Sequence, residues 1–85
     1  MKVTKLHNGG ELRDYGDHQE WWLNGKLHRE DGPAIVDGDF QEWYLNGKLH
    51  REDGPAVVNG DDQEWYINGK LLTKAEFNSR ITKGA

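Results

Sequence analysis

The chain has 85 residues, which is enough for one small domain, and its formal net charge is −4 at pH 7. Leu, Ile, Val and Phe are as scarce as in disordered chains, yet the nine aromatic residues, four of them Trp, indicate a chain that folds. The chain has no apolar run of about 18 residues and no Cys, which excludes a membrane-spanning helix, disulfides and thiolate metal sites. Its acidic balance argues against general nucleic-acid binding.

A unit of 22 residues repeats along the chain. The run from Glu20 to Ala34 recurs almost unchanged from Glu42 to Ala56, and a third copy begins at Glu64. Repetition at a fixed period is typical of repeat architectures. We therefore expect one domain that consists of a degenerate repeat (1–19), two full repeats (20–41 and 42–63), a partial repeat (64–72) and a capping helix (73–82).

Each repeat predicts two β-strands and two tight turns. Asn-Gly at 24–25, 46–47 and 68–69 is the strongest short hairpin signal, because a type I′ turn requires positive φ at both central residues. The expected strands are 2–7, 11–15, 18–23, 26–36, 40–45, 48–58, 62–67 and 70–72. The two longest bend at their Gly-Pro pairs, because Pro cannot donate to the ladder.

The Asn-Gly turns also predict which residues face one another. The turn at 46–47 sets Tyr44 opposite Leu49 and Glu42 opposite Arg51. The turn at 24–25 likewise sets Glu20 opposite Arg29, so that cross-strand ion pairs are expected in both repeats.

A second kind of turn is predicted at Asp37-Gly38 and Asn59-Gly60. With these dipeptides at the centre, Gly32 faces Trp43 and Gly54 faces Trp65. Each Trp would then lie over a glycine.

The C-terminal segment departs from the repeat. Thr73 followed by Glu76 is a capping-box pattern and predicts a helix over 74–81. An array of repeats needs a different terminal element to cover its last open edge, so we expect this helix to be a cap.

The sequence Trp-Tyr-Leu-Asn-Gly-Lys-Leu-His-Arg-Glu-Asp-Gly-Pro-Ala at 43–56 resembles MORN repeats, and more closely their shorter variant. It is similar to tandem repeats of phage and large-virus proteins, and the resemblance covers residues 5–72. It implies an all-β fold, an antiparallel β-meander of about three and a half MORN-like hairpin repeats with a short C-terminal capping helix. Such modules serve as scaffolds and binding surfaces. Arg29 and Arg51 replace the usual Gly after the His, so a lipid-binding role is not carried over.

Residues with catalytic chemistry are scarce. Cys is absent and Ser79 is the only Ser, so no nucleophilic triad can be assembled. Paired carboxylates such as Glu30-Asp31 and Glu52-Asp53 need a pocket for acid–base catalysis. We predict a protein that is not an enzyme, with no catalytic residues and no cofactor.

Three histidines occupy equivalent positions in successive repeats, namely His7, His28 and His50. Equivalent positions lie about 10 Å apart, whereas ligands of one ion lie about 3–4 Å apart. We therefore predict no metal site and a structural role beside Trp. The alternative is a ligand face made of His28, Arg29, His50 and Arg51 that holds a nucleotide-like small molecule.

The alternation of strand residues sends Trp22, Tyr44 and Tyr66 to one face of the sheet. A single sheet of this size cannot bury both its faces, so either the sheet coils strongly or one aromatic stripe packs against a partner. Tyr and Trp are typical binding anchors. Acidic residues flank this stripe and would steer a basic partner toward it. We predict a partner-binding surface that consists of Trp22, Tyr44, Tyr66, Asp39, Glu42, Asp61 and Asp62.

These observations predict a non-enzymatic protein-binding repeat protein. Similarity to phage repeats predicts an inhibitor of a host enzyme or defence system, as an anti-CRISPR or other anti-defence protein. The alternatives are sequestration of a small ligand and a structural, assembly or antitoxin module. The expected partner is a host protein such as a nuclease or another defence enzyme, or a second copy in a homo-oligomer, and neither nucleic acid nor membrane is expected. We expect a cytoplasmic location in an infected or host bacterium.

Overall fold

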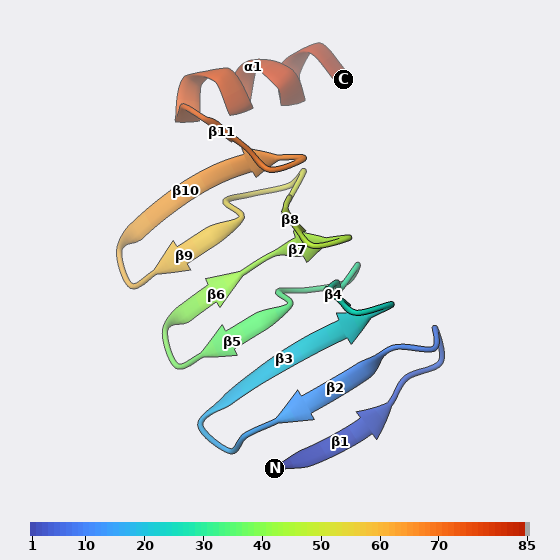
Figure 1. Cartoon of the computed structure of the whole chain (residues 1–85). Helices are drawn as coiled ribbons and strands as arrows, with labels where there is room; N and C mark the ends of the chain where they lie inside the picture. Colours follow the sequence, from blue (N-terminus) through green and yellow to red (C-terminus); the bar gives the residue numbers. More distant parts are fainter. Residues whose placement is uncertain (85) are drawn as a thin grey trace.

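Successive strands form a β-meander that ends in a helix in the computed structural model (Figure 1). The structure describes residues 1–84, with side chains up to Arg80. Neighbouring strands pair antiparallel from one end of the array to the other. The all-β meander with a short C-terminal helix, predicted from the repeat, is confirmed.

The strands of the described residues are short. They are β1 (Lys2–Lys5), β2 (Glu11–Asp14), β3 (His18–Leu23), β4 (Lys26–Leu27), β5 (Ile35–Asp37), β6 (Phe40–Glu42), β7 (Tyr44–Leu45), β8 (Lys48–Leu49), β9 (Val57–Asn59), β10 (Asp62–Ile67) and β11 (Lys70–Leu72). The helix is α1 (Lys74–Gly84).

The predicted strands 18–23, 62–67 and 70–72 are confirmed to the residue. The predicted strands 26–36 and 48–58 are wrong as continuous strands, because each is two short strands joined by a loop. The loops contain the Gly-Pro pairs, where Pro lacks the N–H that a ladder needs. The predicted strand 40–45 is interrupted at Trp43, between β6 and β7.

The Asn-Gly turns and their register are confirmed. Asn46 and Gly47 have φ of 51° and 79°, as a type I′ turn requires, and Tyr44 pairs with Leu49. The turn at 24–25 has the same geometry and pairs Trp22 with Leu27.

The register of the second kind of turn is wrong by two residues. Asp37 pairs with Phe40, so Gly38 and Asp39 are the central residues. Gly38 has φ of 58° at the position that a type II′ turn reserves for Gly. The turn at 60–61 is equivalent. Consequently, Gly32 does not lie opposite Trp43, nor Gly54 opposite Trp65.

The C-terminal helix begins where the capping box predicts it. The backbone N–H of Thr73 donates to Glu76 Oε1 at 2.8 Å, and that of Glu76 donates to Thr73 Oγ1 at 3.1 Å. The helix extends beyond the predicted 74–81 to Gly84. Phe77 is 3% exposed and its ring centroid lies 6.4 Å from that of Trp65, so α1 caps the last repeat.

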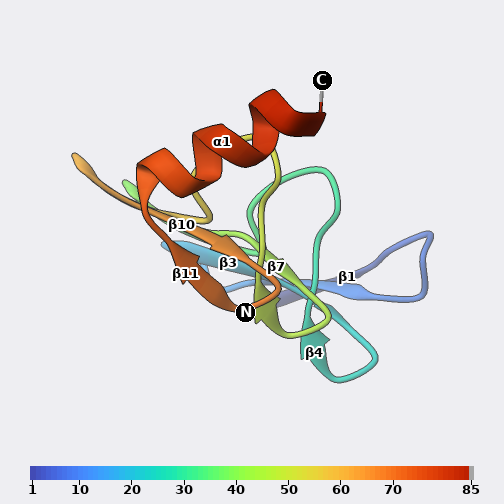
Figure 2. The same cartoon turned by 90° about the horizontal axis from the view of Figure 1, so that it is seen from above.

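The two faces of the sheet differ in what covers them. The helix and the loops at 28–34 and 50–56 lie on the same side (Figure 2). We call this side, which carries Trp21, Trp43 and Trp65, the covered face, and the side that carries Trp22, Tyr44 and Tyr66 the open face. Ala34, Ala56 and Phe77 are the buried apolar residues of the described part of the chain, so the core is thin.

Candidate binding face

On the covered face, each full repeat stacks an arginine on its own tryptophan. Arg51 Cζ lies 3.8 Å from the ring centroid of Trp43, its Nε donates to Asp53 Oδ1 at 2.9 Å, and its Nη1 donates to the carbonyl of Pro55 at 3.1 Å. Arg29 makes the same contacts one repeat earlier. The His-Arg-Glu-Asp-Gly-Pro loop is therefore folded around its own guanidinium.

This arrangement replaces the cross-strand ion pairs expected from the sequence. The predicted pairs Glu20–Arg29 and Glu42–Arg51 are wrong, because each arginine bonds within its own loop. A Cβ on Gly54 would lie 2.8 Å from Arg51 Cζ, and Gly32 has the same relation to Arg29. These glycines make room for a guanidinium rather than for the Trp of the next repeat.

The equivalent histidines connect neighbouring repeats. His28 Nδ1 accepts a hydrogen bond from the backbone N–H of Asn46 at 3.0 Å, and His50 Nδ1 accepts one from that of Asn68 at 2.9 Å. A ring nitrogen that accepts carries no proton, so Nε2 holds the proton of the neutral ring. Each histidine thereby fixes the Asn-Gly turn of the next repeat. Among residues 1–80, no group of three His, Cys or acidic side chains is placed to hold a metal ion.

Three residues of the predicted alternative ligand face, Arg29, His50 and Arg51, line one groove of about 380 Å³ between successive loops. His28 lines an equivalent groove of about 420 Å³ one repeat earlier. Acidic side chains also line both grooves. Glu30 and Asp31 line both, and Glu52 and Asp53 line the groove of about 380 Å³ as well. These carboxylates oppose the binding of a phosphate, and the guanidinium groups already bond within their loops.

On the open face, aromatic and carboxylate side chains alternate along each strand. Trp22 Nε1 donates to Glu20 Oε1 at 2.9 Å, and the Tyr44 hydroxyl donates to Glu42 Oε1 at 3.3 Å. Tyr66 follows Glu64 at the same spacing in the next repeat. The three aromatic residues predicted as binding anchors thus lie on one face, each next to a carboxylate.

Partial burial affects the acid–base properties of this face. Burial raises the pKa of Glu42, the Tyr44 hydroxyl opposes this by donating to the carboxylate, and the charge of Glu64 raises the pKa further. The pKa of Tyr44 is raised by burial and then by the charge of Glu42. Desolvation and the charge of Glu64 raise that of Tyr66. The open face is therefore negative and partly shielded from water.

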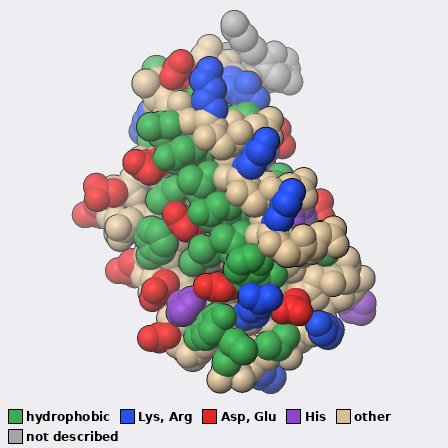
Figure 3. Space-filling model, in the orientation of Figure 1, with side chains coloured by type: hydrophobic (Ala, Val, Ile, Leu, Met, Phe, Trp, Pro, Cys, Tyr) green, Lys and Arg blue, Asp and Glu red, His purple; other side chains and the backbone are tan. Residues whose placement is uncertain are grey.

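The other predicted binding residues lie toward one edge of this face. Asp39 and Asp61 are in the type II′ turns, and Asp62 begins β10. Apolar side chains run along the middle of the face with acidic ones among them, and further acidic side chains follow the left edge (Figure 3). A groove of about 480 Å³ joins the two regions; it is lined by Phe40, Glu42, Val57, Asn59, Asp62, Gln63 and Glu64.

Sequence reasoning missed Phe40 and Val57 in this groove, and it missed Arg13 at the N-terminal end of the open face. Arg13 Cζ lies 4.6 Å from the ring centroid of Trp22. Pairing of Glu11 with Trp22 places Arg13 there, but the connection between β2 and β3 has no Asn-Gly pair from which this register could be read.

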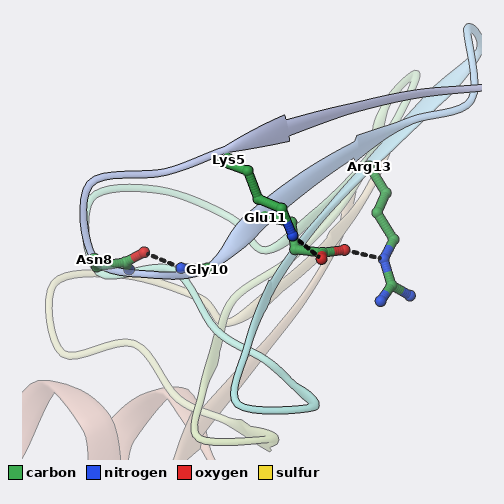
Figure 4. A network of polar contacts seen from close by, with 5 residues as sticks. All are labelled: Lys5, Asn8, Gly10, Glu11 and Arg13. Carbon is green, nitrogen blue, oxygen red and sulfur yellow. Dashed lines mark hydrogen bonds and ion pairs between the residues drawn. The ribbon is translucent and has the colours of Figure 1, made fainter.

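A carboxylate anchors Arg13 in turn. Glu11 accepts hydrogen bonds from Lys5 Nζ at 2.8 Å and from Arg13 Nε at 2.9 Å, and both cations converge on its carboxylate (Figure 4). Both hydrogen bonds lower the pKa of Glu11, and the one from Lys5 has the larger effect.

Comparison with protein-family models, with curated proteins and with solved structures finds no match to this chain. The resemblance to MORN repeats therefore stays a prediction. Within residues 1–84, no helix has the length and apolar character that a membrane span requires.

Proposed function

We propose that this chain is a non-enzymatic protein-binding module and that the open face is its binding surface. The observation that carries the proposal is the row Trp22, Tyr44 and Tyr66, which lies on the face that neither the helix nor the loops cover. Tyr and Trp are enriched among the residues that dominate binding energy at interfaces.

The dimensions of the sheet fit this role. The molecule measures 40 by 27 by 18 Å. A face of that length and width has room for the roughly 800 Å² that each partner contributes to a standard interface. Trp22, Tyr44 and Tyr66 are each partly buried and partly exposed, so part of each ring stays available to a partner.

The finer proposal is that the partner is a host enzyme that the chain inhibits, as a phage anti-CRISPR or other anti-defence protein. It rests on the resemblance to phage repeats and on the acidic open face, which is complementary to the basic groove of a nucleic-acid enzyme. An assembly or antitoxin module would use the same face, so the identity of the partner distinguishes these roles.

Affinity purification from the native host, with the bound proteins quantified, tests the proposal. We expect a stoichiometric partner with the wild-type chain, and its loss with Tyr44→Ala/Tyr66→Ala and with Asp39→Lys/Glu42→Lys/Asp61→Lys. The matched control is Glu30→Ala/Glu52→Ala, which changes exposed side chains of the covered face in two repeats and should retain the partner. Retention of the partner by both open-face variants would show that this face is not the binding surface.

A further inference from the structure

The chain shows within itself how the open face holds a guanidinium. Arg13 stacks on Trp22. Its Nε bonds to the carboxylate of Glu11 (Figure 4). Arg29 and Arg51 repeat the combination on the covered face, each over a Trp and with Nε on an Asp. A guanidinium between an aromatic ring and a carboxylate is thus a recurrent contact of this fold, in which stacking and charge-assisted hydrogen bonding reinforce one another.

Among residues 1–80, only the first of the three aromatic residues of the open face has a cation stacked on it. Tyr44 and Tyr66 are the equivalents of Trp22, and no cation of the described residues stacks on either ring. The reason lies in the sequence, since the positions equivalent to Arg13 are Ile35 and Val57.

The register confirms that these positions are equivalent. Arg13 pairs with Glu20, just as Ile35 pairs with Glu42, and Val57 pairs with Glu64. In two repeats, the aromatic ring and a carboxylate equivalent to Glu20 are therefore present, and an aliphatic side chain stands where the arginine would be. Pro33 and Pro55 stand where Glu11 would be, so the carboxylates available to a cation there are Glu42 and Glu64.

The groove of about 480 Å³ lies at these two repeats. Glu42, Asp62 and Glu64 contribute carboxylates to it, and Phe40 and Val57 contribute apolar surface. This combination suits a side chain with an apolar stem and a cationic head. Guanidinium fits better than ammonium, because it is planar, stacks on aromatic rings and bonds to carboxylates with two donors.

We propose that Glu42 with Tyr44, and Glu64 with Tyr66, bind two arginine side chains of the partner protein. This inference rests on the proposed function and specifies the chemistry of the partner. Equivalent positions in the two repeats are separated by two strand spacings, or about 10 Å. The two arginines of the partner should therefore be about 10 Å apart, as at three-residue spacing in a polyproline II segment or seven-residue spacing along a helix.

A titration of the full chain with synthetic peptides, followed by NMR, tests this inference. The probe is a peptide with two arginines three residues apart, and its neutral counterpart has citrulline at both positions. We expect the arginine peptide to shift the ring resonances of Tyr44 and Tyr66 and to bind about tenfold more tightly than the citrulline peptide. Equal affinity of the two peptides would overturn the inference.

Two variants of equal net charge separate a specific site from general attraction. Glu42→Gln/Glu64→Gln should weaken binding of the arginine peptide about tenfold. Glu30→Gln/Glu52→Gln removes as much negative charge from the covered face and should change the affinity less than about twofold. An equal loss in both variants would mean that only the net charge attracts the peptide, and the inference would be wrong.

A third variant tests the site by filling it from within. Ile35→Arg/Val57→Arg places arginines where Arg13 stands in the first repeat, so the folded variant should no longer bind the peptide. Peptide binding by this variant, with its fold verified by the dispersion of its NMR spectrum, would contradict the proposal.

The native partner distinguishes failure of this inference from failure of the proposed function. If Tyr44→Ala/Tyr66→Ala loses the partner while Glu42→Gln/Glu64→Gln binds it with unchanged affinity, the open face is the binding surface but does not recognise arginine. If neither variant affects the partner, the proposed function is wrong as well.

Discussion

At the scale of the residue, the arginine loops explain how a chain with few apolar residues folds. Trp21 and Trp43 are covered by the guanidinium groups of Arg29 and Arg51 rather than by aliphatic side chains. Each guanidinium is held in turn by an Asp and a Pro carbonyl. Polar side chains of the repeat thus shield the Trp rings from water, as apolar side chains would in a larger core.

Gly54→Ala should destabilise the protein because the new methyl group would displace the guanidinium of Arg51. The added Cβ would lie 2.8 Å from Arg51 Cζ, and Gly54 does not have a positive φ, so the clash is with the side chain and not with the backbone conformation. We expect a loss of about 1–3 kcal/mol in the free energy of unfolding, measured in urea. In the Arg51→Ala background the same substitution should cost little, and an equal cost in both backgrounds would refute the explanation.

Glu42→Gln should stabilise the protein at neutral pH. Burial raises the pKa of Glu42 above its ordinary value of 4.5, so the folded state binds the proton more tightly than the unfolded state. The contribution of Glu42 to the free energy of unfolding is therefore most favourable below pH 4.5. It falls as the pH rises through the higher pKa that Glu42 has in the folded state. Glutamine stays neutral and still accepts a hydrogen bond from Tyr44.

Urea unfolding at about pH 7 and about pH 3.5 measures the difference in free energy of unfolding between Glu42→Gln and the wild type. This difference should be present at the higher pH and absent at the lower. Glu30→Gln changes a carboxylate that is 77% exposed and serves as the control. A gain of the same size at both pH values would show that the charge of Glu42 is not its cause. A carboxylate that reduces stability in the isolated chain is consistent with a role in binding.

At the scale of the element, the sequence predicts well what is determined locally. The Asn-Gly turns and the capping box of α1 depend on residues that are two or three positions apart, and both are confirmed. The second register was wrong because Asp37-Gly38-Asp39 contains two dipeptides that can occupy the centre of a turn. Pairing of Asp37 with Phe40 selects the Gly-Asp turn, and no local signal distinguishes the two.

The candidate site was predictable in part for the same reason. Alternation along single strands places Trp22, Tyr44 and Tyr66 on one face without knowledge of the register. The same alternation places Phe40 on the face of Glu42 and Tyr44, although its position in the groove was not recognised. Val57 joins this face only through the strand pairing that the second turns determine. The arginines of the loops were misassigned because the expected ion pair contributes about 0.2–1 kcal/mol, less than the stacking and hydrogen bonds that replace it.

At the scale of the whole molecule, the array is held together by the same contacts at each junction. His28 bonds to Asn46 and His50 bonds to Asn68, and the N–H of Gly69 donates to the carbonyl of Leu49 as that of Gly47 donates to Leu27. The free energy of such an array is approximately a sum of repeat and junction contributions. The helix closes one end by covering Trp65, where the arginine loop is missing.

Because the junctions are equivalent, a second copy of residues 42–63 inserted after Gln63 should fold and extend the sheet without disturbing the cap. We expect one cooperative urea transition with a higher midpoint, and an m-value larger by about a quarter because the surface exposed on unfolding increases with chain length. In a matched insertion, His50→Ala in the new copy removes the acceptor that fixes the next Asn-Gly turn, and the gain in midpoint should shrink. A lower midpoint than the wild type, or a separate transition for the new repeat, would contradict the equivalence of the junctions.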